Sequence, residues 1–253
     1  MAAPPLLVAC ALGIERLALG RPERAGARGP VTVIRTGMGP RAAERAVDRE
    51  LARPGMAGAA VVATGFCAGL APGMHPGDLV VAEATRDPRG TVLCDGTGLL
   101  AEALARALPG RTVHIGLLTG SDHVVRGHER AELRAGGAVA VDMESAATLW
   151  AATRGRGPAP GAGRGALRGA VPEDPVTGSP VDRAVDRAVG PAGVLIRSAG
   201  GPRVAAVRVI VDAPEHELVR IGTVRGGISA FRVLRAVLPA FFDWHHASLL
   251  PRR

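Results

Sequence analysis

The sequence predicts an α/β domain, and two features support this. Short β-branched apolar runs, typical of buried strands, alternate with segments of helical periodicity along most of the 253 residues. Several runs end at an acidic residue or a glycine turn, as expected at the sheet edge where open α/β folds bind ligands. A chain of this length can bury a full hydrophobic core. We therefore expect residues 1–253 to form one domain.

The apolar runs define the expected strands, at residues 6–11, 31–36, 58–64, 78–84, 112–118, 139–141 and 203–211. Helical periodicity predicts helices at 41–52, 99–108 and 126–134, another beginning near Glu144, and a terminal helix at 231–244. Pro239 is expected to break or kink the terminal helix, which we interpret as packed on the core. Small residues at 65–70 and the stretch 86–96 predict loops.

Residues 154–202 interrupt this pattern. They are dense in Gly, Pro and Arg and have little apolar periodicity. A long stretch of this composition inside a compact domain predicts a disordered insertion. Within it, the near-repeat at 181–189 could form a short helix. We assign the insertion no function.

Charge and cysteine content narrow the function classes. The net charge is +8, but every basic residue is Arg, the arginines alternate with acids, and aromatic content is 2%. This pattern argues against a nucleic-acid partner. The three cysteines lack metal-ligand spacing, so we expect no metal, no cofactor and a cytoplasmic setting. The apolar N-terminus has no basic start and is interrupted by Glu15, so we interpret it as a strand and not a signal peptide.

Three carboxylates follow predicted strands: Glu15, Glu144 and Asp212. Glu144 is placed to accept two hydrogen bonds from a vicinal diol such as that of a ribose. Acids also favour helix N-termini for purely structural reasons, and Glu15 could equally be a surface residue. The turn at 37–39 could cradle an anion, although a tight turn before Pro40 is the simpler interpretation.

Four segments together resemble the nucleoside phosphorylase and nucleosidase superfamily, which includes purine nucleoside phosphorylases and methylthioadenosine/adenosylhomocysteine nucleosidases. They are residues 11–15 (ALGIE), 64–81 (TGFCAGLAPGMHPGDLVV), 141–147 (VDMESAA) and 207–212 (VRVIVD). The resemblance implies a three-layer α/β/α fold around a central mixed sheet. The 12–15 opening and the stretch 211–218 (VDAPEHEL) are most similar to the hopanoid-associated phosphorylase group, which implies release of adenine from adenosylhopane.

The resemblance also implies roles for the three acids. Asp212 matches the family's catalytic acid, which protonates the purine as it leaves. Glu144 matches the residue that holds the ribose diol, with Met143 packed against the sugar. Glu15 matches the residue that orients the attacking water in hydrolytic members. A nearby negative charge would stabilise the oxocarbenium character of the sugar.

The chain departs from the phosphorolytic pattern. Phosphorolytic members commonly carry Arg and Ser where this chain has Ala63 and Phe66, and these two side chains cannot clamp phosphate. Water is therefore the expected co-substrate, although Arg35 or Arg41 could still bind phosphate. Phe66 would make its side of the pocket apolar, which suits a hydrophobic 5′-substituent.

Two further positions are assigned to substrate binding. Gly65 lets a ligand approach the backbone closely. His123 matches a base-stacking aromatic of the nucleosidases, although an ordinary loop histidine is an equal alternative.

The sequence is compatible with several functions. The first is hydrolysis of a 5′-substituted adenosine, a small-molecule or lipid-linked nucleoside, with adenosylhopane as the expected substrate. Others are a methylthioadenosine nucleosidase, a futalosine hydrolase, a phosphorolytic enzyme, or a non-catalytic nucleoside or nucleic-acid binder. A hopanoid substrate would also bring peripheral membrane contact, for which the aromatic C-terminal segment is the candidate. The resemblance further implies a homo-oligomer.

Overall fold

The computed structural model describes residues 4–27, 29–154, 194–196, 201–213 and 223–247. Its strands are β1 (Leu6–Cys10), β2 (Val31–Arg35), β3 (Ala60–Gly69), β4 (Leu79–Asp87), β5 (Gly90–Leu93), β6 (Val113–Gly120), β7 (Ala138–Asp142), β8 (Val194–Ile196) and β9 (Val204–Asp212). They form one mixed sheet in the order β2-β1-β3-β7-β6-β4-β5-β8, with β9 paired to both β3 and β4. The predicted α/β class is confirmed.

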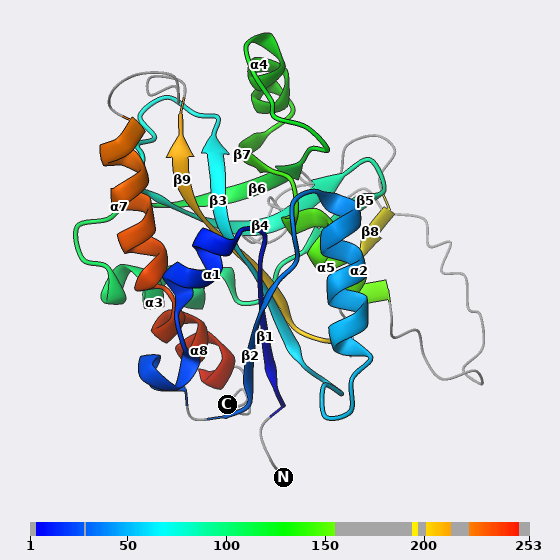
Figure 1. Ribbon diagram of the computed structural model, residues 1–253. Helices are drawn as coiled ribbons and strands as arrows, with labels where there is room; N and C mark the ends of the chain where they lie inside the picture. The colour runs from blue at the N-terminus through cyan, green and yellow to red at the C-terminus, as the bar shows by residue number, and fades with distance from the viewer. Residues whose placement is uncertain (1–3, 28, 155–193, 197–200, 214–222, 248–253) are drawn as a thin grey trace, which may run out of the picture.

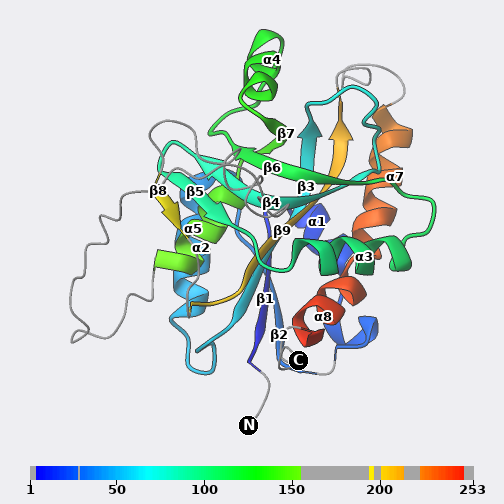
Figure 2. The ribbon, with the colours of Figure 1, turned by 180° about the vertical axis from the view of Figure 1, so that it is seen from behind.

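The helices cover both faces of the sheet, as Figures 1 and 2 show. They are α1 (Gly13–Leu19), α2 (Pro40–Leu51), α3 (Thr97–Ala107), α4 (His128–Ala135), α5 (Ser145–Arg154), α7 (Thr223–Arg235) and α8 (Leu238–Ala247), with a short 3-10 helix at Pro22–Ala25. Alternate residues of β1 pack to opposite sides, because side chains alternate along a strand. Leu6 and Val8 join the core under α1, α3, α7 and α8, whereas Leu7 and Ala9 join the core under α2 and α5. The result is three layers.

Strand directions determine where the site forms. β1, β2, β3 and β9 run parallel, so their carboxyl ends share one edge of the sheet. β7 is antiparallel to β3 and pairs Val141 with Ala68. The chain leaving β7 therefore runs back along β3, toward the level of Gly65. This brings the 142–145 segment to the level at which β1 ends and β9 carries Arg208.

Two sequence predictions, both of loops, were wrong in detail. Residues 65–69 continue β3 and are not a loop, because β9 pairs with them as far as Ala68. The expected loop at 86–96 is largely the end of β4 and the whole of β5, which form an antiparallel hairpin. Within the expected disordered insertion, Val194–Ile196 forms β8 and pairs with β5. The remainder of the insertion, apart from residues 154 and 201–202, lies outside the described residues, as does the proposed helix at 181–189.

The C-terminal aromatics belong to the core. Phe241, Phe242 and Trp244 of α8 are buried, and Phe231 of α7 packs against the same cluster. Helix α7 ends at Arg235, and α8 begins at Leu238. Pro239 therefore lies in the first turn of α8, where a backbone N–H has no partner within the helix and is not needed. These buried side chains are not available for membrane contact. Among the described helices, none combines the length and apolar character needed to cross a bilayer.

Candidate active site

Glu15 is a buried carboxylate held by backbone N–H groups. Its Oε2 accepts hydrogen bonds from the amides of Ala11 and Leu12, both 2.8 Å, and its Oε1 accepts one from Phe66 at 2.7 Å. The first two bonds follow from its position in the first turn of α1, where a glutamate caps the helix start. The third ties α1 to β3. An ionised carboxylate offers about four acceptor positions, so one remains for a ligand or water.

Glu144 is held by the glycine turn before α2. Its Oε1 accepts the Gly39 N–H at 2.9 Å, and Gly39 is the residue that precedes α2. The turn at 37–39 therefore does bind an anion, but the anion is the chain's own carboxylate at the positive end of a helix. Glu144 itself immediately precedes α5, and Met143 beside it is half-buried. This arrangement leaves Oε2 of Glu144 without a hydrogen-bond partner among the described residues.

Arg208 of β9 is the charged group that joins these carboxylates. Its side chain is 1% exposed, and its Nε lies 2.6 Å from Oδ2 of Asp142 and 2.8 Å from Oγ of Ser145. Its Nη1 lies 3.9 Å from Oε2 of Glu144, too far for a hydrogen bond, and has no hydrogen-bond partner in the described part of the chain. The guanidinium of Arg208 thus binds the junction of β7 and α5 through Nε and faces Glu144 through Nη1.

Gly65 makes the approach of Glu15 and Arg208 possible. It pairs with Arg208 in the β3–β9 ladder and has φ +134°, a conformation that favours glycine. A Cβ at this position would overlap Oε1 of Glu15 and lie 2.7 Å from Nη1 of Arg208. Two of the protein's own side chains thus lie close to the backbone at Gly65. Phe66 is half-buried and packs against the core under α1.

Asp212 ends β9, four residues beyond Arg208. Its Oδ2 forms an ion pair with Nη2 of Arg130, and each side chain is 12% exposed. Arg130 belongs to α4, which has no buried residues and projects beyond the layers (Figures 1 and 2). The other carboxylate oxygen of Asp212, Oδ1, and the other terminal nitrogen of Arg130, Nη1, are also buried. Neither atom has a hydrogen-bond partner among the described residues. The structure thus places Asp212 on the strand that carries Arg208, with its charge partner on α4.

His123 lies at the surface after β6. Its Nδ1 is 2.8 Å from Asp122 and its Nε2 is 3.0 Å from Glu129 of α4. Hydrogen bonds to Asp122 and then to Glu129 raise the pKa of His123. Both ring nitrogens are thus engaged, and the side chain is 59% exposed.

The electrostatics of the cluster depend on Arg208. Burial raises the pKa of Glu144, and the neighbouring charges of Asp142 and Glu15 add to this effect, whereas Arg208 and the Gly39 N–H oppose it. Burial disfavours the charged form of Arg208, but the three carboxylates outweigh burial and raise its pKa. The guanidinium therefore stays charged. No group of three or more metal-ligating side chains is found within the residues that the structure describes.

Sequence reasoning missed Arg208 and Arg130. The available signal for Arg208 was one arginine inside an otherwise apolar, β-branched strand, since a charge in a buried strand requires a partner. No comparable signal existed for Arg130, because α4 has the composition of a solvated helix. Asp142 and Ser145 flank the predicted Glu144, but their contact with Arg208 could not be inferred from spacing.

The family of this chain follows from a comparison with known protein families. Residues 19–157, more than half of the chain, match the model described as the phosphorylase superfamily. The chain therefore belongs to this superfamily. A search of curated protein sequences gives no match.

Solved structures confirm the fold of this family. The methylthioadenosine/S-adenosylhomocysteine nucleosidase of Colwellia psychrerythraea 34H, in complex with adenine, aligns with TM-score 0.60 and 13% identity over 96% of this chain and 95% of that chain. Futalosine hydrolase of Helicobacter pylori aligns with TM-score 0.60 and 13% identity over 98% and 99%. The nucleosidase of S. pneumoniae, with a transition-state inhibitor, aligns with TM-score 0.57 and 17% identity over 94% and 99%. At these identities the likeness concerns the architecture.

Proposed function

We propose that this protein is a purine nucleosidase that hydrolyses the N-glycosidic bond of a 5′-substituted purine nucleoside. The observation that carries the proposal is the cluster of Glu15, Glu144 and Arg208 beside Gly65, at the level where β1 ends. Glu144 keeps one oxygen for a sugar diol, and Glu15 keeps one acceptor position for water. The solved relatives described as nucleosidases and futalosine hydrolase support the same reaction class.

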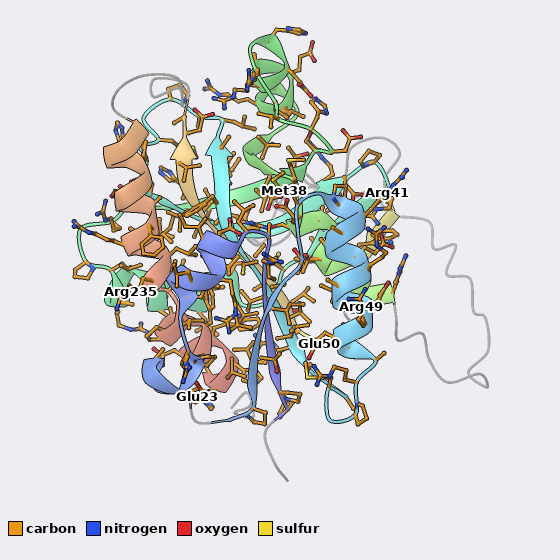
Figure 3. The ribbon with its side chains drawn as sticks, in the orientation of Figure 1. Glu23, Met38, Arg41, Arg49, Glu50 and Arg235 are labelled. Atoms are coloured by element: carbon orange, nitrogen blue, oxygen red, sulfur yellow. The ribbon has the colours of Figure 1, made fainter. Side chains whose placement is uncertain are left out.

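The charge of the cluster favours water over phosphate as the nucleophile. Three carboxylates, those of Glu15, Asp142 and Glu144, surround the single guanidinium of Arg208. A phosphate dianion would enter a region that already carries excess negative charge, which is costly in a buried site. Arg35 and Arg41 are the two residues that could bind phosphate in place of Ala63 and Phe66. Both are exposed, and Figure 3 labels Arg41 on α2. Hydrolysis requires none of these arginines.

In the proposed reaction, the water oxygen forms a bond to C1′ while the C1′–N9 bond breaks. Glu15 orients the water and accepts its proton, and Asp212 donates a proton to N7 of the departing purine. The negative charge around Arg208 stabilises the oxocarbenium character of the sugar. The Asp212 carboxyl group that would donate this proton is paired through Oδ2 with Nη2 of Arg130. The ion pair must therefore open when the purine binds.

The finer proposal is that the 5′-substituent is hydrophobic, as in adenosylhopane. Ile14, next to Glu15, is 53% exposed, and Met38, next to Gly39, is 66% exposed. Figure 3 labels Met38 in the turn that precedes α2. These two apolar side chains, each next to a residue of the site, are available to contact an apolar group. The sequence similarity to the hopanoid-associated phosphorylase group supports the same substrate, and we retain Phe66, Met143 and His123 as proposed substrate contacts.

The test is an assay of adenine release, with and without phosphate, from methylthioadenosine, adenosylhopane and a 5′-alkyl adenosine of intermediate length. We expect release without phosphate and a preference for the longer substituents. Asp212→Asn should lower turnover at least ~100-fold if Asp212 supplies a typical general-acid contribution. Asp243→Asn is the matched control, because Asp243 is exposed on α8.

Each part of the proposal has its own contradicting result. Strict dependence on phosphate would replace hydrolysis with phosphorolysis. Unchanged turnover in Asp212→Asn would remove Asp212 from the mechanism. A preference for the methylthio substrate would overturn the hydrophobic 5′-group and leave the nucleosidase assignment standing.

A further inference from the structure

Half of the large hydrophobic side chains that the described chain exposes lie beside the candidate active site. Of the six, Ile14 and Leu17 belong to α1, and Met38 lies in the turn before α2. Leu17 is 73% and Met38 66% exposed, the two highest values of the set. Ile14 and Leu17 are three residues apart, so they share one face of α1, away from its buried residues.

The turn that carries Met38 lies against the start of α1. The Gly37 N–H donates to the Ala11 carbonyl at 3.1 Å, and Nη1 of Arg35 lies 3.6 Å from the position that a Cβ on Gly13 would occupy. Figures 1 and 3 show α1 and the start of α2 on the side of the molecule that faces the viewer. The exposed side chains of these segments therefore form one surface. We name it the α1–turn surface, and it consists of Ile14, Leu17, Arg35, Met38 and Arg41.

The charges that these segments expose are of one sign. Across residues 4–20 and 29–43, every charged side chain other than Glu15 is an arginine. Glu15 is 2% exposed and is held by backbone N–H groups inside the site, whereas Arg35 and Arg41 are exposed. The α1–turn surface therefore presents apolar side chains together with cations.

This combination matches the surface of an anionic lipid bilayer. Apolar side chains can enter the boundary between headgroups and acyl chains, while arginines are attracted to anionic lipids. A second copy of the chain matches less well. A two-fold interface brings the same patch of both copies together, which here would place arginines against arginines.

The surface is also continuous with the site. Ile14 precedes Glu15, and Met38 precedes Gly39, whose N–H binds Glu144. An apolar group that leaves a bilayer at this surface therefore reaches the carboxylate cluster without crossing another part of the protein. The aromatic side chains of α8, buried in the core, take no part.

We propose that the α1–turn surface docks on an anionic lipid bilayer and that the apolar substrate enters the site from that bilayer. Docking is independent of the reaction. The delivery of substrate rests on the proposed function.

Cosedimentation of the full-length protein with vesicles tests the docking. Vesicles of phosphatidylcholine and phosphatidylglycerol are compared with vesicles of phosphatidylcholine alone. Leu17→Ser should weaken binding to the anionic vesicles about 10-fold or more, because the leucine side chain is no longer buried in the bilayer. Leu99→Ser is the matched control and should bind as the parent does. Leu99 is also exposed, but it lies on α3, which Figures 1 and 2 place on the opposite side of the molecule from α1.

The arginine variants test the electrostatic part. Arg35→Gln should weaken binding to anionic vesicles roughly fivefold and leave binding to neutral vesicles unchanged. Arg41→Gln should have a smaller effect, because Arg41 also interacts with Asp122. Added salt should weaken the binding of the parent protein and reduce the difference between the two vesicle types.

Adenine release links the docking to the substrate. Leu17→Ser should turn over methylthioadenosine in solution as the parent does, since Leu17 does not touch the carboxylate cluster. Its turnover of a 5′-alkyl adenosine embedded in anionic vesicles should fall in proportion to its vesicle binding. A variant damaged in folding would lose both activities.

The outcomes separate docking from the reaction. A parent protein that binds neither vesicle type, or a Leu17→Ser protein that binds as tightly as the parent, overturns the docking. A lower mass of Leu17→Ser in light scattering, with unchanged vesicle binding, assigns the surface to contact between copies and overturns it as well. Vesicle binding without adenine release from any nucleoside overturns the proposed function and leaves the docking intact.

Discussion

Gly65→Ala tests the close packing of the site most directly. Gly65 has φ +134°, and a Cβ would overlap Oε1 of Glu15 while lying 2.7 Å from Nη1 of Arg208. Neither neighbour can move freely. Glu15 is held by three backbone N–H groups, and Arg208 by Asp142 and Ser145. We therefore expect the variant to lose both stability and activity.

The magnitude follows from two effects. An alanine held in this backbone conformation costs about 1–3 kcal/mol. Displacement of Glu15 leaves the buried amide of Phe66 without its acceptor, which costs a further ~1–3 kcal/mol. The expected loss of about 2–6 kcal/mol is large against the total stability of about 5–15 kcal/mol that is typical of a domain. Displacement of Glu15 also removes the proposed water-binding position, so adenine release should fall.

Urea denaturation measures the stability change, and Gly98→Ala is the matched control. A Cβ on Gly98 of α3 meets no atom within 4 Å, so the same substitution should be neutral or stabilising by up to about 1 kcal/mol. A Gly65→Ala protein within about 0.5 kcal/mol of the parent and with full activity would refute the packing described for Glu15 and Arg208.

Three other predictions concern residues around the site and the core. Arg130→Met removes the partner of Asp212, and since the purine then displaces no ion pair, kcat/KM should rise several-fold; a fall would instead assign Arg130 to substrate binding. Burial lowers the pKa of His245, although its Nε2–H donates to a backbone carbonyl. The free energy of unfolding should therefore decrease as the pH falls below about 6.5. The contribution of His245 to this pH dependence should be absent in His245→Gln. Trp244→Phe removes the 2.7 Å hydrogen bond to the Asp95 carbonyl and should lower the free energy of unfolding by about 1–3 kcal/mol in thermal melts; an unchanged melting temperature would contradict that bond.

Much of the architecture was predictable from local sequence. The run at Leu6–Cys10 is a fully buried strand, and the β-branched run at 204–212 is β9. The positions of Glu15 after the first strand and Glu144 before a helix also follow from local pattern, because strand ends and helix starts leave signals in nearby residues. The glycine turn before Pro40 was likewise visible, although its ligand was not.

Contacts between distant segments required the tertiary structure. The strand character of 65–69 depends on pairing with β9, and the β4–β5 hairpin forms where the composition indicated a loop. A strand of small residues is specified by its neighbours in the sheet and not by its own propensity.

The charged residues show the same difference between what local sequence predicts and what the tertiary structure decides. The sequence determined which residues are acidic and that an arginine interrupts β9. Only the fold decided that Arg208 is enclosed between Asp142 and Glu144, and that Arg130, 82 positions away, pairs with Asp212. The physical reason is that the energy of a charge depends on its burial and on partners supplied by other strands and helices. Those partners are brought together only when the sheet has formed.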